Sequence, residues 1–186
     1  MKAIFGVGKF LLQFFPLTIF LKVAFLHGQP QATDWLNAFV WGGSAAVLQL
    51  VFSMLIAQGK PLNRIMLGVN WYLIVGAAAV MSNQTALLAL FNNLKESGIF
   101  LCLLMVGICT TFGSKAGFVG VPATAEAFET SVRRDIRTYS IWLIVIACIG
   151  LVLSFCFRGQ IIISAAAPLV FLSVAIRLLQ RHLQHN

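Results

Sequence analysis

The side chains that could carry out chemistry are few in this sequence, and they stand apart from one another. All acidic residues and histidines lie in predicted loops or at the ends of apolar stretches: Asp34, Glu96, Glu126, Glu129, Asp135, His27, His182 and His185. A proton-coupled carrier usually places an acid or a histidine inside the membrane, so this class is disfavoured. Because no set of nucleophile, base or ligands can be assembled, we expect no catalytic residue, no cofactor and no metal site.

The cysteines also argue against a redox or metal centre. All of them lie within apolar stretches and outside any CxxC pair: Cys102, Cys109, Cys148 and Cys156. Cys102 and Cys109 are two helical turns apart, about 10 Å along a helix axis, which is too far for a disulfide bond. Together with Met105 they could offer a row of sulfur ligands to Cu(I), but without a CxxC pair or paired histidines they indicate core packing.

Four of the polar residues inside the apolar stretches, where polar groups are costly, could line a path through the membrane. They are Gln13, Lys22, Gln49 and Asn70. One interpretation is helix packing, in which amides bond across a seam of small residues. The other is a solvated path through the membrane lined by Gln49 and Asn70. Lys22 either extends its ammonium group to the headgroup region or contacts an anion or a lipid headgroup.

Composition places the chain in a membrane. Hydrophobic residues make up 60% of the sequence and charged residues 10%, whereas soluble domains are about half apolar and about a quarter charged. A water-soluble fold with so few charges could not cover its own surface, so the apolar excess must face lipid. The net charge of +8 is spread in small groups between apolar stretches. This pattern is typical of membrane orientation signals and not of a nucleic-acid groove.

Six apolar stretches predict an all-α polytopic membrane protein that forms one transmembrane domain over residues 1–186. The predicted spans are approximately 5–25, 35–57, 65–81, 97–113, 139–157 and 161–176. The first is the weakest, because its uncharged part, residues 10–21, falls short of the roughly 20 residues that cross a bilayer. A re-entrant or surface helix is the alternative there. Pro16 and Pro168 lie inside the first and last spans, where each frees a backbone carbonyl.

The distribution of positive charge supports the count of six spans. If the N-terminus is cytosolic and six spans alternate, ten of the 13 Lys and Arg residues lie on the cytosolic side. The remaining three, Lys22, Lys95 and Arg158, face the opposite side. Such a bias is expected because cytosolic loops carry an excess of basic residues. The sequence therefore predicts an integral protein of a bacterial inner membrane with both termini in the cytoplasm.

One long loop, residues 114–138, connects the fourth and fifth spans on the cytosolic side. Its second half, residues 124–137, has the pattern of an amphipathic helix, with acids near its start and arginines near its end. Apolar residues repeat every four positions, with arginines beside them: Phe128, Val132 and Ile136, then Arg133, Arg134 and Arg137. Such a helix would lie on the membrane surface or dock a partner.

These features predict a non-catalytic subunit or assembly factor of a membrane complex. Its partners would be the lipid bilayer and other membrane proteins, or a second copy of itself, and not nucleic acid. Small residues on the second and fifth spans would join the arginine-bearing helix in these contacts. The two faces are Gly42, Ala46, Gln49 and Ser53, and Leu143, Ala147, Gly150 and Ser154. The alternatives are a small-solute transporter or channel lined by Gln49 and Asn70 and, third, an intramembrane lipid-modifying enzyme.

Overall fold

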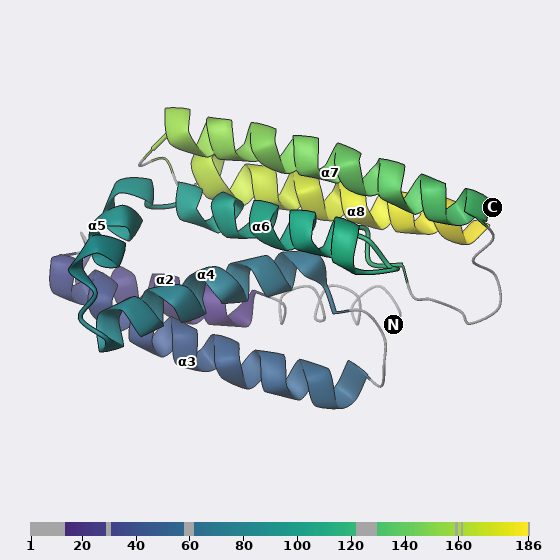
Figure 1. The fold of residues 1–186 in the computed structure, drawn as a ribbon. Coiled ribbons are helices and arrows are strands. Elements are labelled where there is room, and N and C mark those ends of the chain that lie inside the picture. The colour runs from purple at the N-terminus through teal and green to yellow at the C-terminus, as the bar shows by residue number, and fades with distance from the viewer. Residues whose placement is uncertain are drawn as a thin grey trace, which may run out of the picture. The chain divides into compact units, whose positions relative to one another are not determined.

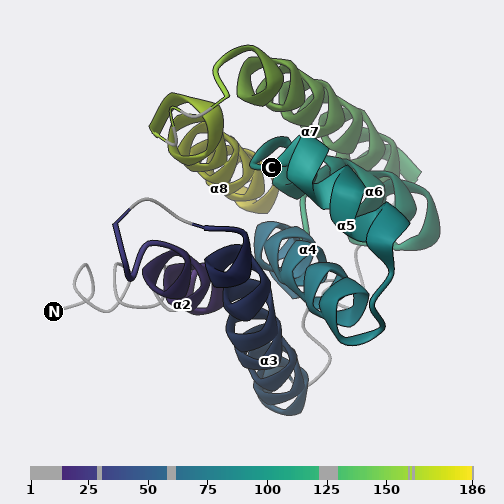
Figure 2. The ribbon, with the colours of Figure 1, turned by 90° about the vertical axis from the view of Figure 1, so that its left-hand side faces the viewer.

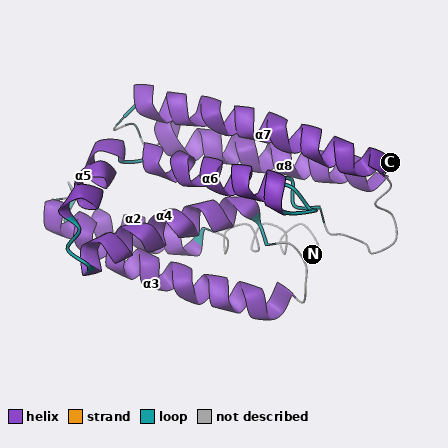
Figure 3. Cartoon of the chain, viewed as in Figure 1, coloured by secondary structure: helices purple, strands orange, loops and turns teal. Residues whose placement is uncertain are grey.

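In the residues that it describes, the computed structural model of the chain is almost entirely helical (Figures 1 and 3). It describes residues 14–28, 31–57, 62–121, 130–158, 160 and 162–185. The helices are α2 (Phe15–Ala24), α3 (Ala32–Ala57), α4 (Arg64–Met81), α5 (Thr85–Leu94), α6 (Ser97–Gly113), α7 (Thr130–Cys156), the π-helix η1 (Ile162–Ala166) and α8 (Ala167–His185). Among the described residues there is no strand, which confirms the all-α class predicted from the sequence.

Four of the described helical segments are long and apolar enough to cross a membrane. They are Thr33–Ile56, Arg64–Met81, Arg133–Cys156 and Ile162–Leu183. The helices α5 and α6 pass the same test together but meet at a bend of 103°, so five spans result if this pair counts as one. The helix α2 has 10 described residues, a length of about 15 Å against a hydrocarbon layer of about 30 Å. Residues 5–13 lie outside the described part, so the count of six spans stays a prediction.

Two helices extend beyond the apolar stretches that predict them. The fifth stretch begins at residue 139, whereas α7 begins at Thr130. The sixth stretch ends at residue 176, whereas α8 continues to His185. Hydropathy detects only the part of a helix whose side chains can contact lipid. The backbone hydrogen bonds of the helix continue into further turns whose side chains are polar and exposed.

The extension of α7 bears on the amphipathic helix predicted for residues 124–137. From Thr130 onward this segment is continuous with the apolar part of α7, with the arginines of residues 133–137 exposed and Ile136 buried. Phe128 and the side chain of Val132 lie outside the described residues. A separate amphipathic helix before the span therefore stays a prediction.

The chain divides into two compact units, and the first comprises Met1–Ile56 and Val69–Asn93. In this unit α2, α3 and α4 lie beside one another (Figure 2). Rings from α2, α3, α4 and α5 form its core, with centroids 4.9 to 5.5 Å apart in the pairs Phe20–Phe39, Phe39–Tyr72, Phe39–Phe91 and Tyr72–Phe91. Tilted and edge-on pairs of this kind stabilise packing beyond the area they bury, because the positive edge of one ring meets the negative face of another.

Glycines allow α3 to approach its neighbours closely in the first unit. A Cβ at Gly43 would lie against the Cβ of Ala77 and 2.9 Å from the carbonyl oxygen of Leu73 on α4. Gly42 meets Phe20 of α2 in a similar way, and Ala46, one turn further along α3, is fully buried. This part of the small-residue face thus packs inside the chain, and not against a partner as the sequence led us to expect.

The second unit comprises Ala57–Gly68 and Leu94–Asn186, and in it α6, α7 and α8 lie side by side (Figures 1 and 2). A Cβ at Gly150 of α7 would lie 2.9 Å from the ring of Phe100 on α6 and 3.4 Å from Pro168 on α8. The other members of this face of α7 are buried too: Leu143, Ala147 and Ser154. The small-residue face of the fifth span is therefore also internal, contrary to the docking role expected of it.

The last span begins with a turn of π-helix, η1, just before Pro168. Proline has no amide hydrogen, so the carbonyl of Ser164 loses its usual α-helical donor. The sequence predicts this loss, and the structure shows how the helix adapts, by adopting π-type geometry over Ile162–Ala166. Single π turns of this kind are found inside α-helices where the regular hydrogen-bond ladder is interrupted.

Gly43→Ala tests the close approach of α3 and α4. The new methyl group would meet Ala77 and a backbone carbonyl, neither of which can move aside, so we expect the free energy of unfolding to fall by about 1–3 kcal/mol. Gly113→Ala is the matched control, since a Cβ there meets nothing within 4 Å. Thermal unfolding in detergent, followed by circular dichroism, measures both variants, and equal stabilities would contradict this packing.

Candidate functional site

Gln49 on α3 and Asn70 on α4 form a polar contact inside the first unit. The Nδ2 of Asn70 donates a hydrogen bond of 2.7 Å to the Oε1 of Gln49. Asn70 is fully buried and Gln49 is half-buried, so the bond lies among apolar side chains. An interhelical bond of this kind ties membrane helices together, typically by about 0.6–2 kcal/mol. The contact favours the packing interpretation of these two amides.

The structure does not bring Lys22 to this amide pair. Lys22 is exposed in the last turn of α2, two residues after Phe20. Phe20 packs at Gly42, and Gln49 lies seven residues further along α3, about 10 Å along the helix axis. Gln13 lies outside the described residues. Two of the four residues predicted to line a path are therefore brought together, and Lys22 is at the surface.

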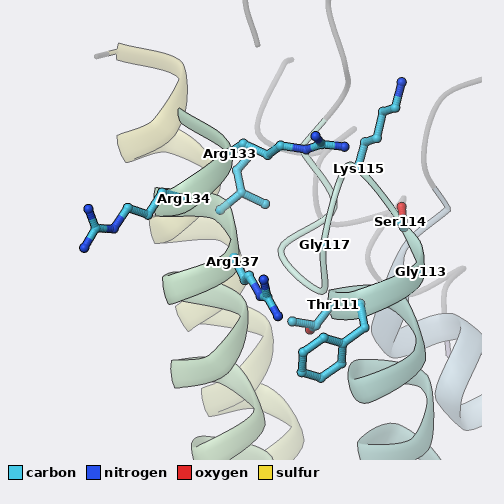
Figure 4. Close-up of a pocket in the computed structure, with 10 residues that line it drawn as sticks. Thr111, Gly113, Ser114, Lys115, Gly117, Arg133, Arg134 and Arg137 are labelled. Carbon is cyan, nitrogen blue, oxygen red and sulfur yellow. The ribbon is translucent and has the colours of Figure 1, made fainter. Parts of the chain in front are cut away.

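A cavity of about 610 Å³ opens in the second unit, where α6 ends and α7 begins (Figure 4). Its wall consists of Thr111, Phe112, Gly113, Ser114, Lys115, Gly117, Arg133, Arg134, Ile136 and Arg137. Four of these side chains are cationic, and none of the lining residues that the structure describes is a carboxylate. Positive charge is therefore concentrated around a concave surface, which favours the binding of anions.

The cations around the cavity differ in direction. Figure 4 shows Arg133 extending from α7 toward the turn that carries Lys115, and Arg137 facing the end of α6. The guanidinium carbon of Arg137 lies 5.1 Å from the centroid of the Phe112 ring, which is a cation–π contact. Arg134 points away, on the other side of α7. An anion in the cavity would therefore meet Arg133 and Arg137, while the exposed side chain of Lys115 at the rim extends away from them.

Ser140 of α7 fastens the turn that forms one wall of the cavity. Its Oγ accepts hydrogen bonds from the amide of Phe118 at 2.9 Å and from the amide of Val119 at 3.4 Å. Gly117 has a φ of +61°, a left-handed conformation that favours glycine. Ile136 lies under this turn and is 2% exposed. It therefore packs inside the unit, instead of presenting the docking face that the sequence suggested.

Side chains from α8 and from the start of α4 hold other parts of the turn. The Nε2 of Gln180 donates to the carbonyl of Val119 at 2.7 Å and lies 3.4 Å from that of Gly120. Arg64, within the same unit, donates from its Nη2 to the Oγ of Ser114 at 3.3 Å. The turn is thus held by residues far away in the sequence, which gives the cavity a defined wall.

Sequence analysis identified part of this cavity and missed the rest. The predicted docking residues that line it are Arg133, Arg134, Ile136 and Arg137. The sequence indicates Lys115 only as an orientation signal and Phe112 only as part of an apolar span. The sequence does hold a hint for Lys115, because this residue directly follows the end of the fourth predicted span and lies on the same side of the membrane as the arginines in the predicted topology. No local pattern could have indicated that Ser140 binds the turn.

The structure shows no other chemical centre in the part of the chain that it describes. Within that part no group of three or more His, Cys, Asp or Glu side chains could hold a metal ion. The cysteines are free thiols, and on α6 Cys102 is half-buried while Cys109 is exposed. Met105 is exposed as well. These sulfur atoms do not share an enclosed site.

A double-mutant cycle measures the bond between Gln49 and Asn70. Gln49→Leu and Asn70→Leu each remove one partner and should each lower the free energy of unfolding. The double variant should lose less than the sum, with a coupling of about 0.6–2 kcal/mol. Denaturant titration in mixed micelles measures these values. Ser44→Ala is the control, because that hydroxyl donates to the Val40 carbonyl of its own helix at 2.8 Å. Strict additivity of the two leucine changes would show that no bond couples them.

Ser140→Ala tests the fastening of the turn. Two buried amides lose their acceptor, so we expect the free energy of unfolding to fall by about 1–3 kcal/mol. Ser173→Ala is the matched control, since this buried hydroxyl donates within its own helix, to the carbonyl of Leu169. Hydrogen exchange should also become faster at the amides of Phe118 and Val119 in the first variant alone. Equal losses of stability and unchanged exchange would be incompatible with this role of Ser140.

No protein-family model, curated protein or solved structure matches the chain. The site that its geometry offers is the basic cavity, in which Arg133 and Arg137 face the end of α6 and its exposed aromatic ring, Phe112. Guanidinium and ammonium groups bind carboxylates and phosphates through charge-assisted hydrogen bonds. The arrangement can therefore bind an anion, while the amide pair on α3 and α4 links two helices.

Proposed function

We propose that this chain is a non-catalytic, multi-span membrane protein that acts as a subunit or accessory factor of a membrane assembly. Its basic cavity holds an anionic group of that assembly. The observation that carries the proposal is the convergence of Arg133 and Arg137 on one cavity that Lys115 also lines, with no described carboxylate in its wall.

This convergence goes beyond what membrane orientation requires. Basic residues orient a span through their presence in a cytosolic loop, wherever in the loop they stand. Here the side chains of Arg133 and Arg137 turn toward one cavity, while that of Arg134 turns away. Like charges held near one another repel, and this repulsion is relieved when an anion enters between them. An anion-binding role accounts for the direction of these side chains as well as for their charge.

The proposed setting is a bacterial inner membrane with both termini in the cytoplasm. In that orientation α2 belongs to the first of six spans, and α5 with α6 accounts for the outer loop and the fourth. Lys115 and the arginines at the start of α7 then lie among the ten cytosolic cations of the sequence. The cavity would therefore open toward the cytoplasm, where the positive-inside rule places such charges.

The polar side chains inside the helical units support a binding role and not transport or catalysis. A transport path needs polar groups inside the membrane that a solute can reach. The amides of Gln49 and Asn70 instead bond to each other across α3 and α4. An intramembrane enzyme would need a nucleophile and a base in mutual reach, and the cations of the cavity supply neither.

Charge reversal in the cavity tests the proposal. In the double variant Arg133→Glu and Arg137→Glu, two repulsions replace two attractions, so the chain should leave its assembly. Native gel electrophoresis of the tagged chain, extracted gently from its own membranes, should show one large species for the wild type. The double variant should run as the free chain, with at least a roughly tenfold loss of the large species.

The matched control changes as much charge at the same end of the unit. Arg177→Glu with Arg181→Glu replaces two exposed arginines of α8, neither of which lines the cavity. This variant should keep the large species. A wild-type chain that runs alone under gentle extraction, or equal losses in the two double variants, would contradict the proposed function.

A further inference from the structure

We propose that the anionic group held in the cavity is the phosphate of an anionic phospholipid of the cytoplasmic leaflet. This inference rests on the proposed role of the cavity as an anion site, and it names the ligand. The volume of about 610 Å³ lies within the range of small-ligand sites. It leaves room for a headgroup around the phosphate.

The polar part of the cavity suits phosphate oxygens. The guanidinium groups of Arg133 and Arg137 can each present two parallel N–H donors, and Lys115 adds an ammonium charge. Ser114 also lines the cavity, where its Oγ accepts hydrogen bonds from Arg64 and from the amide of Ala116. Both bonds use lone pairs of this hydroxyl, so its hydrogen can still be donated to a phosphate oxygen.

The apolar part of the site continues away from the cavity along α6 and α7. Arg137 lies over Phe112, and Phe112 is 64% exposed although it is a large apolar ring. One turn further from the cavity are Ile108 on α6 and Ile141 on α7, both exposed. Residues three or four apart lie on the same face of a helix. Because α6 and α7 run in opposite directions, counting back from Phe112 on α6 and forward from Arg137 on α7 follows two faces that lie next to each other.

Exposed apolar side chains continue along both of these helix faces and form two ridges. On α6 they comprise Phe112, Ile108, Met105 and Leu101, and on α7 Ile141, Val145 and Cys148. From Phe112 to Leu101 the ridge is about 16 Å long, which matches one leaflet, half of a hydrocarbon layer of about 30 Å. A cation cluster at the head of two apolar ridges of this length fits a phospholipid, with its phosphate in the cavity and an acyl chain along the ridges.

A soluble phosphate compound would use only the cationic part of this site. It would gain nothing from the exposed ring of Phe112 or from the ridges below it. Basic pockets between membrane helices on the cytoplasmic side bind anionic headgroups for the same reason, since charge attraction and apolar burial act together there. We therefore assign the cavity to a lipid phosphate and make free phosphate an outcome of the test.

The test is native mass spectrometry of the purified full-length chain in detergent micelles. Phosphatidylglycerol and phosphatidylcholine with identical acyl chains are titrated in separate arms, and inorganic phosphate in a third. The wild type should bind phosphatidylglycerol at least about tenfold more tightly than phosphatidylcholine, because phosphatidylcholine has no net charge. Millimolar inorganic phosphate should not displace the bound phosphatidylglycerol.

Variants locate the binding site. Arg133→Gln with Arg137→Gln should weaken phosphatidylglycerol binding roughly 30-fold, whereas Arg177→Gln with Arg181→Gln, two exposed arginines of α8 outside the cavity wall, should leave it within about threefold of the wild type. Circular dichroism and thermal unfolding check that both variants fold. Equal wild-type binding of the two lipids overturns the inference without any variant. Full displacement by inorganic phosphate, or equal effects of the two variants, overturns it as well.

The two proposals can fail separately. If the cavity variants lose the large species on native gels but the wild type shows no preference for phosphatidylglycerol, the anionic group belongs to a protein and the lipid inference is wrong. If the preference for phosphatidylglycerol depends on Arg133 and Arg137 while the chain runs alone on native gels, the lipid inference holds and the accessory role fails.

Discussion

The arrangement of the second unit depends on the hydrogen bonds that satisfy the turn after α6. This turn places the amides of Phe118 and Val119 in the interior, where both residues are fully buried. Buried amides and carbonyls without partners would cost more than the turn could gain. The hydroxyl of Ser140 and the amide of Gln180 supply those partners. With the turn fixed in this way, the turn and the start of α7 form the two sides of a cavity lined by Lys115, Arg133 and Arg137.

The cost of leaving a buried polar group without a partner also distinguishes the polar side chains inside the helical units from the cations near the helix ends. Three polar side chains within the helical units, Gln49, Asn70 and Ser140, bond to another helix or turn of the chain, where lipid would offer no hydrogen-bond partner. The cations around the cavity lie just after the end of α6 and at the start of α7. The interior polar groups thus hold the helices together, and the groups available to a ligand are concentrated at one end of the second unit.

The sequence predicts much of the fold and less of the site, for a physical reason. Apolar stretches indicate α3, α4 and α6 to within a few residues, because lipid contact and helix length are local properties of the chain. The start of α7 and the end of α8 lie in polar turns that hydropathy does not register. Ser140 and Gln180 bond to residues 22 and 61 positions away, and no periodicity along the sequence encodes such contacts.

The bond from Gln180 to the carbonyl of Val119 has a consequence for biosynthesis. Membrane helices are inserted in order as the chain is made, and α8 is the last described element to emerge. Until then the carbonyl of Val119 lacks the donor that holds it in the finished unit, although α6, the turn and α7 already exist. The wall of the cavity thus reaches its final form only after α8 has been made, so a nascent chain that stops before α8 would have its arginines in place but an incomplete binding site.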